Sequence, residues 1–286
     1  MIAYIDAHVH PPVPAFLDGP LAPYRRGIEA HLGMVLEPLE PSEIAEHYRQ
    51  RNARAVLHGW DTSEASGEIP FGSEKVAEVV AAAPDVFIGL GAVDPALGAR
   101  SVARVHETAS LGLAGLSFHP SAQGLAPTSR RAHPVFEAAE EHGLVCVVHT
   151  GATRVGAGMP GGAGIRLSPA RPVYVDEVAA SFPDLTLVIA HVGDLWFDEA
   201  VAVAEHKANV YLDLSGQDPT TFDGRLRHRL ETDLVDKVVF GSDFPFGSPD
   251  RWLAKWDALG MPEKITNSVL RDTAQTVFGS AESAGE

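Results

Sequence analysis

The chain has 286 residues, and 45% of them are hydrophobic, so it can bury a sizeable core. Its 38 acidic and 22 basic side chains give a formal net charge of −16 without a basic patch, which argues against a nucleic-acid partner. No apolar run approaches the roughly 20 residues that cross a bilayer, so we expect no membrane partner. The first residues lack a positively charged segment followed by an apolar stretch, and we therefore expect no secretory signal and a cytoplasmic location.

Eight short runs rich in Val, Ile, Leu and Phe recur along the chain, and each predicts a strand. They lack the polar and apolar alternation of half-exposed strands, which is typical of strands buried on both faces of a parallel sheet. The runs are Ile2–His10, Ala55–His58, Phe87–Val93, Leu113–His119, Val145–His149, Leu185–His191, Val210–Leu214 and Val238–Ser242.

Longer amphipathic segments separate these runs and predict helices, the first of them capped by Ser42. They are Pro41–Arg51, Ser73–Ala83, Ala99–Leu111, Ala132–His142, Val173–Phe182, Trp196–His206, Thr220–Thr232, Pro249–Ala258 and Pro262–Phe278. Eight strand-then-helix units favour an α/β fold that is a single (β/α)8 TIM barrel over an open sheet, and such a barrel typically takes about 250 residues.

We expect one domain, because neither a sequence repeat nor a linker is evident. The barrel should span residues 1–279, and residues 280–286 should form an unstructured tail. Three long connections follow predicted strands, at the edge where barrel enzymes form their sites: Pro11–Glu40, Gly59–Gly72 and Gly151–Pro172. The glycine-rich part of the third, residues 156–164, predicts either a mobile lid or a plain surface loop.

Imidazole and carboxylate groups lie at the ends of several predicted strands. His8 and His10 are two positions apart on the first strand and would face the same side, while His149, His191 and Asp243 follow the fifth, sixth and eighth strands. Independent core histidines would have no reason to share one rim of a barrel. The pattern therefore predicts that a divalent metal ion is their common ligand.

The same strand ends carry the motifs Ile5–His10, Val147–Gly151, Ile189–Gly193, Asn209–Ser215 and Phe240–Phe246. Together these motifs resemble the amidohydrolase superfamily, and most of all the branch that contains aminocarboxymuconate-semialdehyde decarboxylase, resorcylate decarboxylases and several lactonases. The resemblance covers nearly the whole chain. The motifs are specific for this branch and not for a substrate.

The resemblance implies that His8, His10, His149 and Asp243 bind one divalent ion. Zinc is our first expectation for this ion, and manganese, iron and cobalt are the alternatives, because all four accept nitrogen and oxygen ligands. The resemblance also implies two catalytic residues. Asp243 would accept a proton from metal-bound water, and His191 would act as an acid–base group above the substrate.

Two positions on the predicted strands bear on these roles. Members of the superfamily with two metals use a carboxylated lysine on the fourth strand, but the segment Gly112–Pro120 contains no lysine, so we expect one ion. Many relatives in this branch carry lysine where Ser117 stands. Asp6 lies deeper on the face of His8, where we expect a buried acceptor for neighbouring donors and not a catalytic group.

Further residues would lie at the same end of the barrel. His119 ends the fourth strand and His58 the second, and each is either a substrate contact or a packed core residue. Arg154 and Arg166 would bind a substrate carboxylate through paired hydrogen bonds, or else be solvated loop residues. Trp196 would form a wall of the pocket, or else pack on its own helix.

The first function that we expect is hydrolysis of a C–O or C–N bond, in a lactone, ester or amide. The substrate would be a small, acidic or cyclic molecule, attacked by metal-bound hydroxide. The alternative is a metal-dependent, non-oxidative decarboxylation of an aromatic or muconate-like acid, a carbon–carbon lyase reaction with the same ligands. A non-enzymatic barrel with a structural metal is a third possibility, but a structural site has no use for a base such as His191. The resemblance is also compatible with a homodimer.

Overall fold

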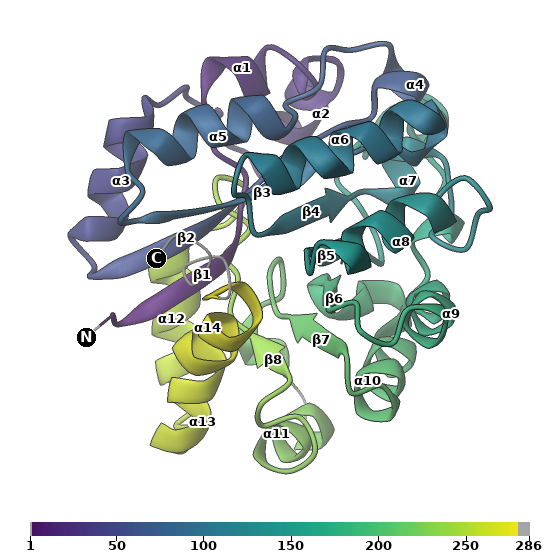
Figure 1. The fold of residues 1–286 in the computed structure, drawn as a ribbon. Coiled ribbons are helices and arrows are strands. Elements are labelled where there is room, and N and C mark those ends of the chain that lie inside the picture. Colours follow the sequence, from purple (N-terminus) through teal and green to yellow (C-terminus); the bar gives the residue numbers. More distant parts are fainter. Residues whose placement is uncertain (1, 223, 280–286) are drawn as a thin grey trace.

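The computed structural model describes residues 2–222 and 224–279, and it shows one parallel sheet of eight strands in sequential order inside a ring of helices (Figure 1). The predicted (β/α)8 barrel is therefore confirmed. The strands are β1 (Tyr4–Val9), β2 (Ala53–His58), β3 (Phe87–Ala92), β4 (Gly115–Phe118), β5 (Val145–His149), β6 (Leu187–Ala190), β7 (Val210–Asp213) and β8 (Val238–Val239). The predicted tail, residues 280–286, lies outside the described residues.

The barrel closes between β1 and the segment that follows β8. The Ala7 N–H donates to the Phe240 carbonyl at 2.8 Å, the Asp243 N–H donates to the His8 carbonyl at 3.0 Å, and the His10 N–H donates to the Phe244 carbonyl at 2.8 Å. The predicted eighth strand extended to Ser242, but β8 ends at Val239 and the chain then pairs with β1 in these single bonds. Closure thus brings Asp243 beside the end of β1.

All predicted helices are present, and most of their bounds differ from the prediction by one or two residues. The largest differences are in the predicted helix 220–232, which begins at Gly224, and in the last predicted helix, which is divided by a π-helical segment. The outer helices are α3 (Pro41–Arg49), α5 (Ser73–Ala82), α6 (Ala99–Ser110), α8 (His133–Glu141), α9 (Val173–Ser181), α10 (Phe197–His206), α11 (Gly224–Glu231), α12 (Pro249–Asp257), α13 (Glu263–Asn267), η6 (Ser268–Asp272) and α14 (Thr273–Phe278). The predicted cap Ser42 was wrong: α3 begins after Glu40, whose N–H donates to the Glu43 carboxylate at 2.8 Å.

The three long connections contain short helices that the sequence did not predict. The longest one holds an eleven-residue helix, α2, with Pro23 in its first turn and Gly27 in its middle. Proline is tolerated in the first turn, whereas Gly27 lowers the helix propensity of the interior, so the segment was interpreted as a connection without a helix. The three connections contain α1 (Pro14–Leu17), α2 (Ala22–Leu32), α4 (Ser63–Ser66), η2 (Pro160–Gly164) and η3 (Ser168–Ala170). Four further short elements lie elsewhere in the described part of the chain: η1 (Pro95–Leu97), α7 (Pro120–Gln123), η4 (His191–Trp196) and η5 (Pro219–Thr221).

The interior of the barrel is filled by aliphatic side chains from the strands, including Ile5, Val56 and Leu90. At its amino-terminal end α14 contacts β1 and β8 and adds Val277 and Phe278 to this cluster (Figure 1). Burying each large apolar side chain contributes about 1.5–3 kcal/mol. One end of the barrel is therefore a packed core, and the chemistry-bearing side chains lie at the other end.

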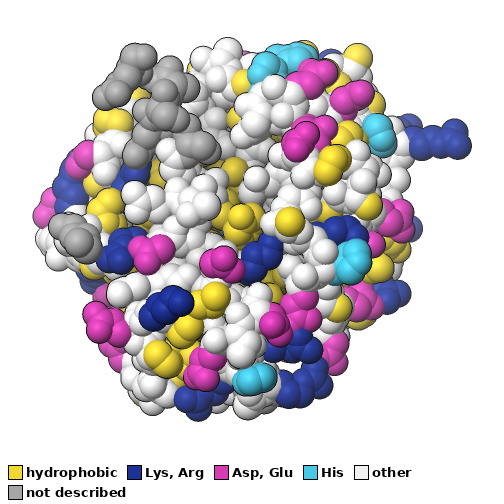
Figure 2. All heavy atoms as spheres, turned by 60° about the horizontal axis from the view of Figure 1, so that its bottom comes forward, with side chains coloured by type: hydrophobic (Ala, Val, Ile, Leu, Met, Phe, Trp, Pro, Cys, Tyr) yellow, Lys and Arg dark blue, Asp and Glu magenta, His cyan; other side chains and the backbone are white. Residues whose placement is uncertain are grey.

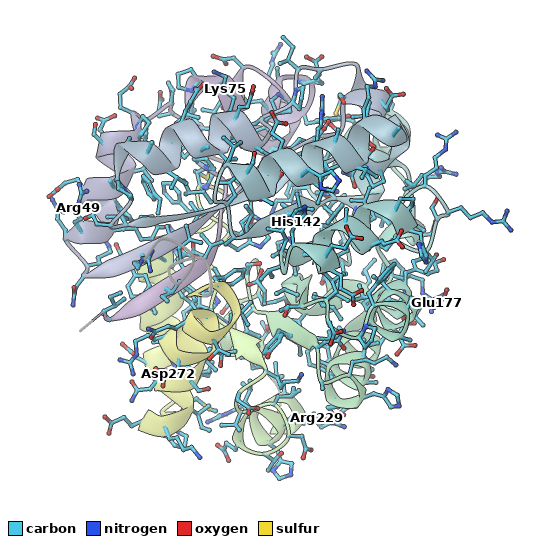
Figure 3. All side chains as sticks on the ribbon, in the orientation of Figure 1. Arg49, Lys75, His142, Glu177, Arg229 and Asp272 are labelled. Carbon is cyan, nitrogen blue, oxygen red and sulfur yellow. The ribbon has the colours of Figure 1, made fainter. Side chains whose placement is uncertain are left out.

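Charged side chains cover the outside. On the face in Figure 2, Asp and Glu are interspersed with Lys and Arg, with small hydrophobic patches between them. Figure 3 shows Arg49, Lys75, Glu177 and Arg229 on the outer helices. In the part of the chain that the structure describes, no helix is long and apolar enough to span a membrane.

Candidate metal centre

Three side chains from the two joined strand ends form a group of possible metal ligands: His8 in β1, His10 directly after β1, and Asp243 in the turn after β8. One donor atom from each lies within 4.8 Å of the others. His8 Nε2 is 3.3 Å from His10 Nε2, and Asp243 Oδ1 is 4.0 Å and 3.8 Å from these two nitrogens. All three residues are buried. The predicted convergence on β1 therefore exists, and it includes the carboxylate.

The orientation of the His8 ring is set by Asp213 at the end of β7. His8 Nδ1 donates to Asp213 Oδ2 at 2.7 Å, so the lone pair of His8 lies on Nε2, toward His10 and Asp243. A metal-bound histidine commonly donates its second ring nitrogen to a carboxylate in this way. Sequence reasoning assigned no role to Asp213, although the residue lies within the Asn209–Ser215 motif.

The protonation of these groups fits a metal ligand set. Burial lowers the pKa of both His8 and His10 well below the usual value, so both rings are neutral at pH 7 and keep a lone pair for a cation. Within the described residues, buried His10 Nδ1 has no hydrogen-bond partner. Two imidazole nitrogens and a carboxylate oxygen are a donor set suited to a divalent ion such as zinc or manganese.

His149 lies in the same cavity but outside this group of three donors. Its ring stacks on His119, with centroids 3.8 Å apart and planes 13° apart. His149 Nε2 lies 3.1 Å from the Ala152 carbonyl oxygen, to which it donates, and burial lowers the pKa of His149 well below its usual value. Neither nitrogen of His149 belongs to the group of three close donors, so ligation by His149 stays a prediction.

His191 begins the turn after β6 and lies between the imidazoles of the site. Its ring centroid is 4.8 Å from that of His8 and 4.7 Å from that of His149. His191 Nδ1 is 3.1 Å from the Ser215 carbonyl and 2.9 Å from Ser215 Oγ, which leaves Nε2 as the nitrogen available for proton transfer. His191 and Asp243 have positive φ values of 61° and 59°, a conformation that is strained for residues with a Cβ and recurs at functional sites.

His58 and Asp6 have structural contacts below the metal ligands. The His58 ring stacks on His8 at a centroid distance of 4.0 Å, its Nε2 donates to the Ala7 carbonyl at 2.9 Å, and its Nδ1 accepts from Ser117 Oγ at 3.1 Å. Both ring nitrogens are therefore already engaged. Asp6 accepts hydrogen bonds from the Tyr48 hydroxyl at 2.8 Å and from Ser242 Oγ at 2.6 Å, which agrees with the structural role predicted for it.

A cavity of about 250 Å³ opens beside the three donors and is lined by His119, His149, His191, Arg154 and Asp243, among other residues. Arg154 is the only lysine or arginine among its described lining residues, and its Nη1 donates to Asp243 Oδ2 at 3.0 Å. His119 Nε2 lies 3.2 Å from Thr153 Oγ1. The predicted positions of Arg154 and His119 at the mouth of the barrel therefore agree with the structure.

Two predicted substrate contacts are not on the wall of this cavity. The exposed Arg166 lies near the Gly124 carbonyl, with Nη2 3.4 Å from the oxygen. Trp196 is half-buried, and the Arg171 guanidinium lies over its ring at 5.8 Å from the centroid. The aromatic walls are instead Trp60 and Phe246, which come from connections whose path no residue periodicity specifies.

Comparison with known proteins agrees with this arrangement. The model of the amidohydrolase family matches residues 5–280. The chain belongs to this family. No curated protein matches the chain.

Solved structures share the fold over nearly the whole length of this amidohydrolase. An uncharacterised TIM-barrel protein from Bordetella bronchiseptica is 22% identical, with a TM-score of 0.76, over 98% of this chain and 99% of that chain. The 5-carboxyvanillate decarboxylase from Sphingomonas paucimobilis is 18% identical, with a TM-score of 0.67, over 98% and 99%. The 2,6-dihydroxybenzoate decarboxylase from Rhizobium is 15% identical, with a TM-score of 0.68, over 98% and 99%.

Proposed function

We propose that this amidohydrolase-family enzyme decarboxylates a small aromatic or muconate-like acid without oxidation, using one divalent ion held by His8, His10, Asp243 and His149. The observation that carries the proposal is the cavity beside these donors, in which one guanidinium, Arg154, lies among aromatic walls. Such a cavity suits a planar molecule with a negative charge. Several similar structures are decarboxylases of substituted benzoates, and one of them, from Novosphingobium aromaticivorans, contains manganese.

The chain's own residues would bind and orient the acid. The Arg154 guanidinium attracts a carboxylate through charge-assisted hydrogen bonds, and the rings of Trp60 and Phe246 flank a planar substrate. When bound, the divalent ion supplies positive charge that stabilises the negative charge developing on the substrate.

The proton would pass through His191, whose Nδ1 is already engaged by Ser215. His191 Nε2 takes up a proton from solvent and gives it to the ring carbon that carries the carboxylate. The bond from that carbon to the carboxylate then breaks, its electron pair returns to the ring, and carbon dioxide leaves. The reaction therefore consumes one proton from solvent and needs neither an oxidant nor a reductant.

Hydrolysis of a lactone, ester or amide is the second candidate. The observation that favours it is the Asp243 carboxylate, which is buried, has a raised pKa because of burial, and lies beside the two imidazoles. A carboxylate in this position is suited to accept a proton from an attacking water molecule.

One substrate panel separates the two reactions. The metal-loaded enzyme is incubated with hydroxybenzoates and muconate-like acids, with carbon dioxide as the readout, and with lactones and esters, with acid release as the readout. Carbon dioxide release without hydrolysis supports the proposal. Acid release from lactones or esters without carbon dioxide from any acid contradicts it and supports the second candidate.

A further inference from the structure

A second cavity of about 150 Å³ adjoins the first. Four residues line both cavities: Arg154, Gly216, Gln217 and Asp243. The second cavity extends from this shared wall to the start of α12, where the indole ring of Trp252 forms part of its lining. The two cavities therefore lie side by side, and the paired side chains of Arg154 and Asp243 belong to both.

The second cavity gathers three basic side chains: Arg154, Arg251 and Lys255. This concentration is unusual in a chain with a formal net charge of −16. Lys255 pairs with Asp218, and Arg154 pairs with Asp243. The exposed Arg251 has no acidic partner within the described residues, so one positive charge is in excess.

The backbone at the start of α12 also contributes positive charge to this wall of the second cavity. α12 has nine residues and begins at Pro249, and Ser248 Oγ accepts from the Arg251 N–H at 3.4 Å. The amino-terminal end of a helix carries a partial positive charge, which favours a nearby anion. The helix end and the Arg251 guanidinium therefore both favour an anion at this wall.

We propose that the second cavity is a subsite for a carboxylate of the substrate, and that Arg251 selects acids with two carboxylates over acids with one. One carboxylate of such a diacid lies beside Arg154 in the first cavity, and the other lies beside Arg251 in the second. This inference rests on the proposed function only in that the substrate is an acid held in the first cavity.

Binding of benzoate and of the three benzenedicarboxylates tests the subsite without turnover. Dissociation constants are measured by calorimetry on the metal-loaded enzyme and on the variants Arg251→Ala and Arg251→Lys. Arg130→Ala is the matched control, because Arg130 is exposed and lines neither cavity. Since Arg251 is exposed as well, the variants are expected to fold.

At least one dicarboxylate should bind the unaltered enzyme about tenfold more tightly than benzoate, because a hydrogen bond to a charged group contributes roughly this much. Arg251→Ala should remove that advantage and leave benzoate binding unchanged, Arg251→Lys should restore part of it, and Arg130→Ala should change nothing. The subsite is refuted if no dicarboxylate binds more tightly than benzoate, or if Arg251→Ala weakens both acids equally.

The subsite and the decarboxylase activity can be rejected independently of each other. Selective loss of dicarboxylate binding in Arg251→Ala, without carbon dioxide release from any acid, retains the subsite and rejects the decarboxylase. Carbon dioxide release that Arg251→Ala does not alter for any diacid retains the decarboxylase and rejects the subsite.

Discussion

His191 is held by Ser215 through Nδ1 and is not one of the three close donors, so we expect it to act in catalysis and not in metal binding. His191→Asn should lower turnover about 100-fold or more, because a positioned acid–base group contributes at least this much. Metal content should stay near one ion per chain, as measured by elemental analysis. The exposed His206→Asn is the control. Loss of metal in His191→Asn would show that His191 is a ligand.

Asp213 is expected to influence metal binding through its hydrogen bond to His8. Asp213→Asn keeps the size of the side chain but removes the charge that accepts the His8 Nδ1 proton at 2.7 Å. Metal affinity should fall about 10–100-fold, which is typical when such a partner of a ligand is lost. Competition with a chelator measures the affinity, and thermal unfolding checks that the variant is folded. An unchanged affinity would mean that Asp213 only stabilises the barrel.

The end of the barrel opposite the site depends on one short element, α14. Phe278 is 1% exposed and packs with Val277 into the interior cluster. Phe278→Ala should lower the free energy of unfolding by about 3–5 kcal/mol, because the substitution removes buried apolar surface and leaves a cavity in the core. Urea denaturation measures this loss. Gln275→Ala, on the exposed side of the same helix, should change it little, and equal losses in both variants would contradict the packing role.

The elements differ in how much of them the sequence could predict. Strands such as β5 and β6 are buried on both faces, so their continuous apolar runs were easily recognised. α2 was missed because Gly27 weakens its helical pattern, while its stability comes from the packing of Tyr24 and Ile28, which the pattern does not show. His8 and His10 could be paired from their spacing on β1. Asp213 could not be paired with His8, because strand spacing does not say which carboxylate at the rim meets which imidazole.

The positions of side chains in the long connections were also difficult to predict from the sequence. Arg154 was correctly expected near the mouth of the barrel, but Arg166, in the same connection, lies away from the cavity. Trp60 and Phe246 were not considered, because the loops that carry them have no periodicity from which a direction can be predicted. Residues on strands have a predictable face, whereas residues on long loops depend on the folded path of the chain.

For the molecule as a whole, buried neutral histidines make stability depend on pH. Burial lowers the pKa of His58 to about 4 and that of His119 to about 3, from a usual value of 6.5. Between pH 6.5 and about 4 the unfolded chain binds more protons at these rings than the folded chain does. Their contribution to stability is therefore full above pH 6.5 and is lost as the pH falls.

Buried carboxyls oppose this trend. The pKa of Asp6 is raised by burial from 3.8 to about 7, and burial also raises the pKa values of Asp213 and Asp243. Their contribution is lost as the pH rises through the folded pKa. Because His8, His10 and His149 add to the two histidines above, we expect the net stability of the metal-free protein to fall on acidification.

His58→Asn isolates one part of this effect. Urea unfolding is measured at pH 7.5, about one unit above the usual pKa of histidine, and at pH 4.5, about two units below it. The two free energies of unfolding give the slope of stability against pH. The variant should show a flatter slope than the unaltered protein, by up to one proton. His228→Asn, on the outer helix α11, should leave the slope unchanged. Equal slopes for both variants would show that His58 is not buried neutral.

Bound metal should stabilise the whole barrel, because its donors join the first strand to the segment that closes the sheet. An ion that binds only the folded chain adds about 4 kcal/mol when its free concentration is a thousand times the dissociation constant. Removal of the metal with a chelator should lower the unfolding temperature and abolish turnover, and adding back zinc, manganese, iron or cobalt in turn should show which ion restores both. His10→Ala should be insensitive to all four ions. If the unfolding temperature of the unaltered enzyme does not respond to any of them, then His8, His10 and Asp243 are a buried hydrogen-bonded cluster and not a metal centre.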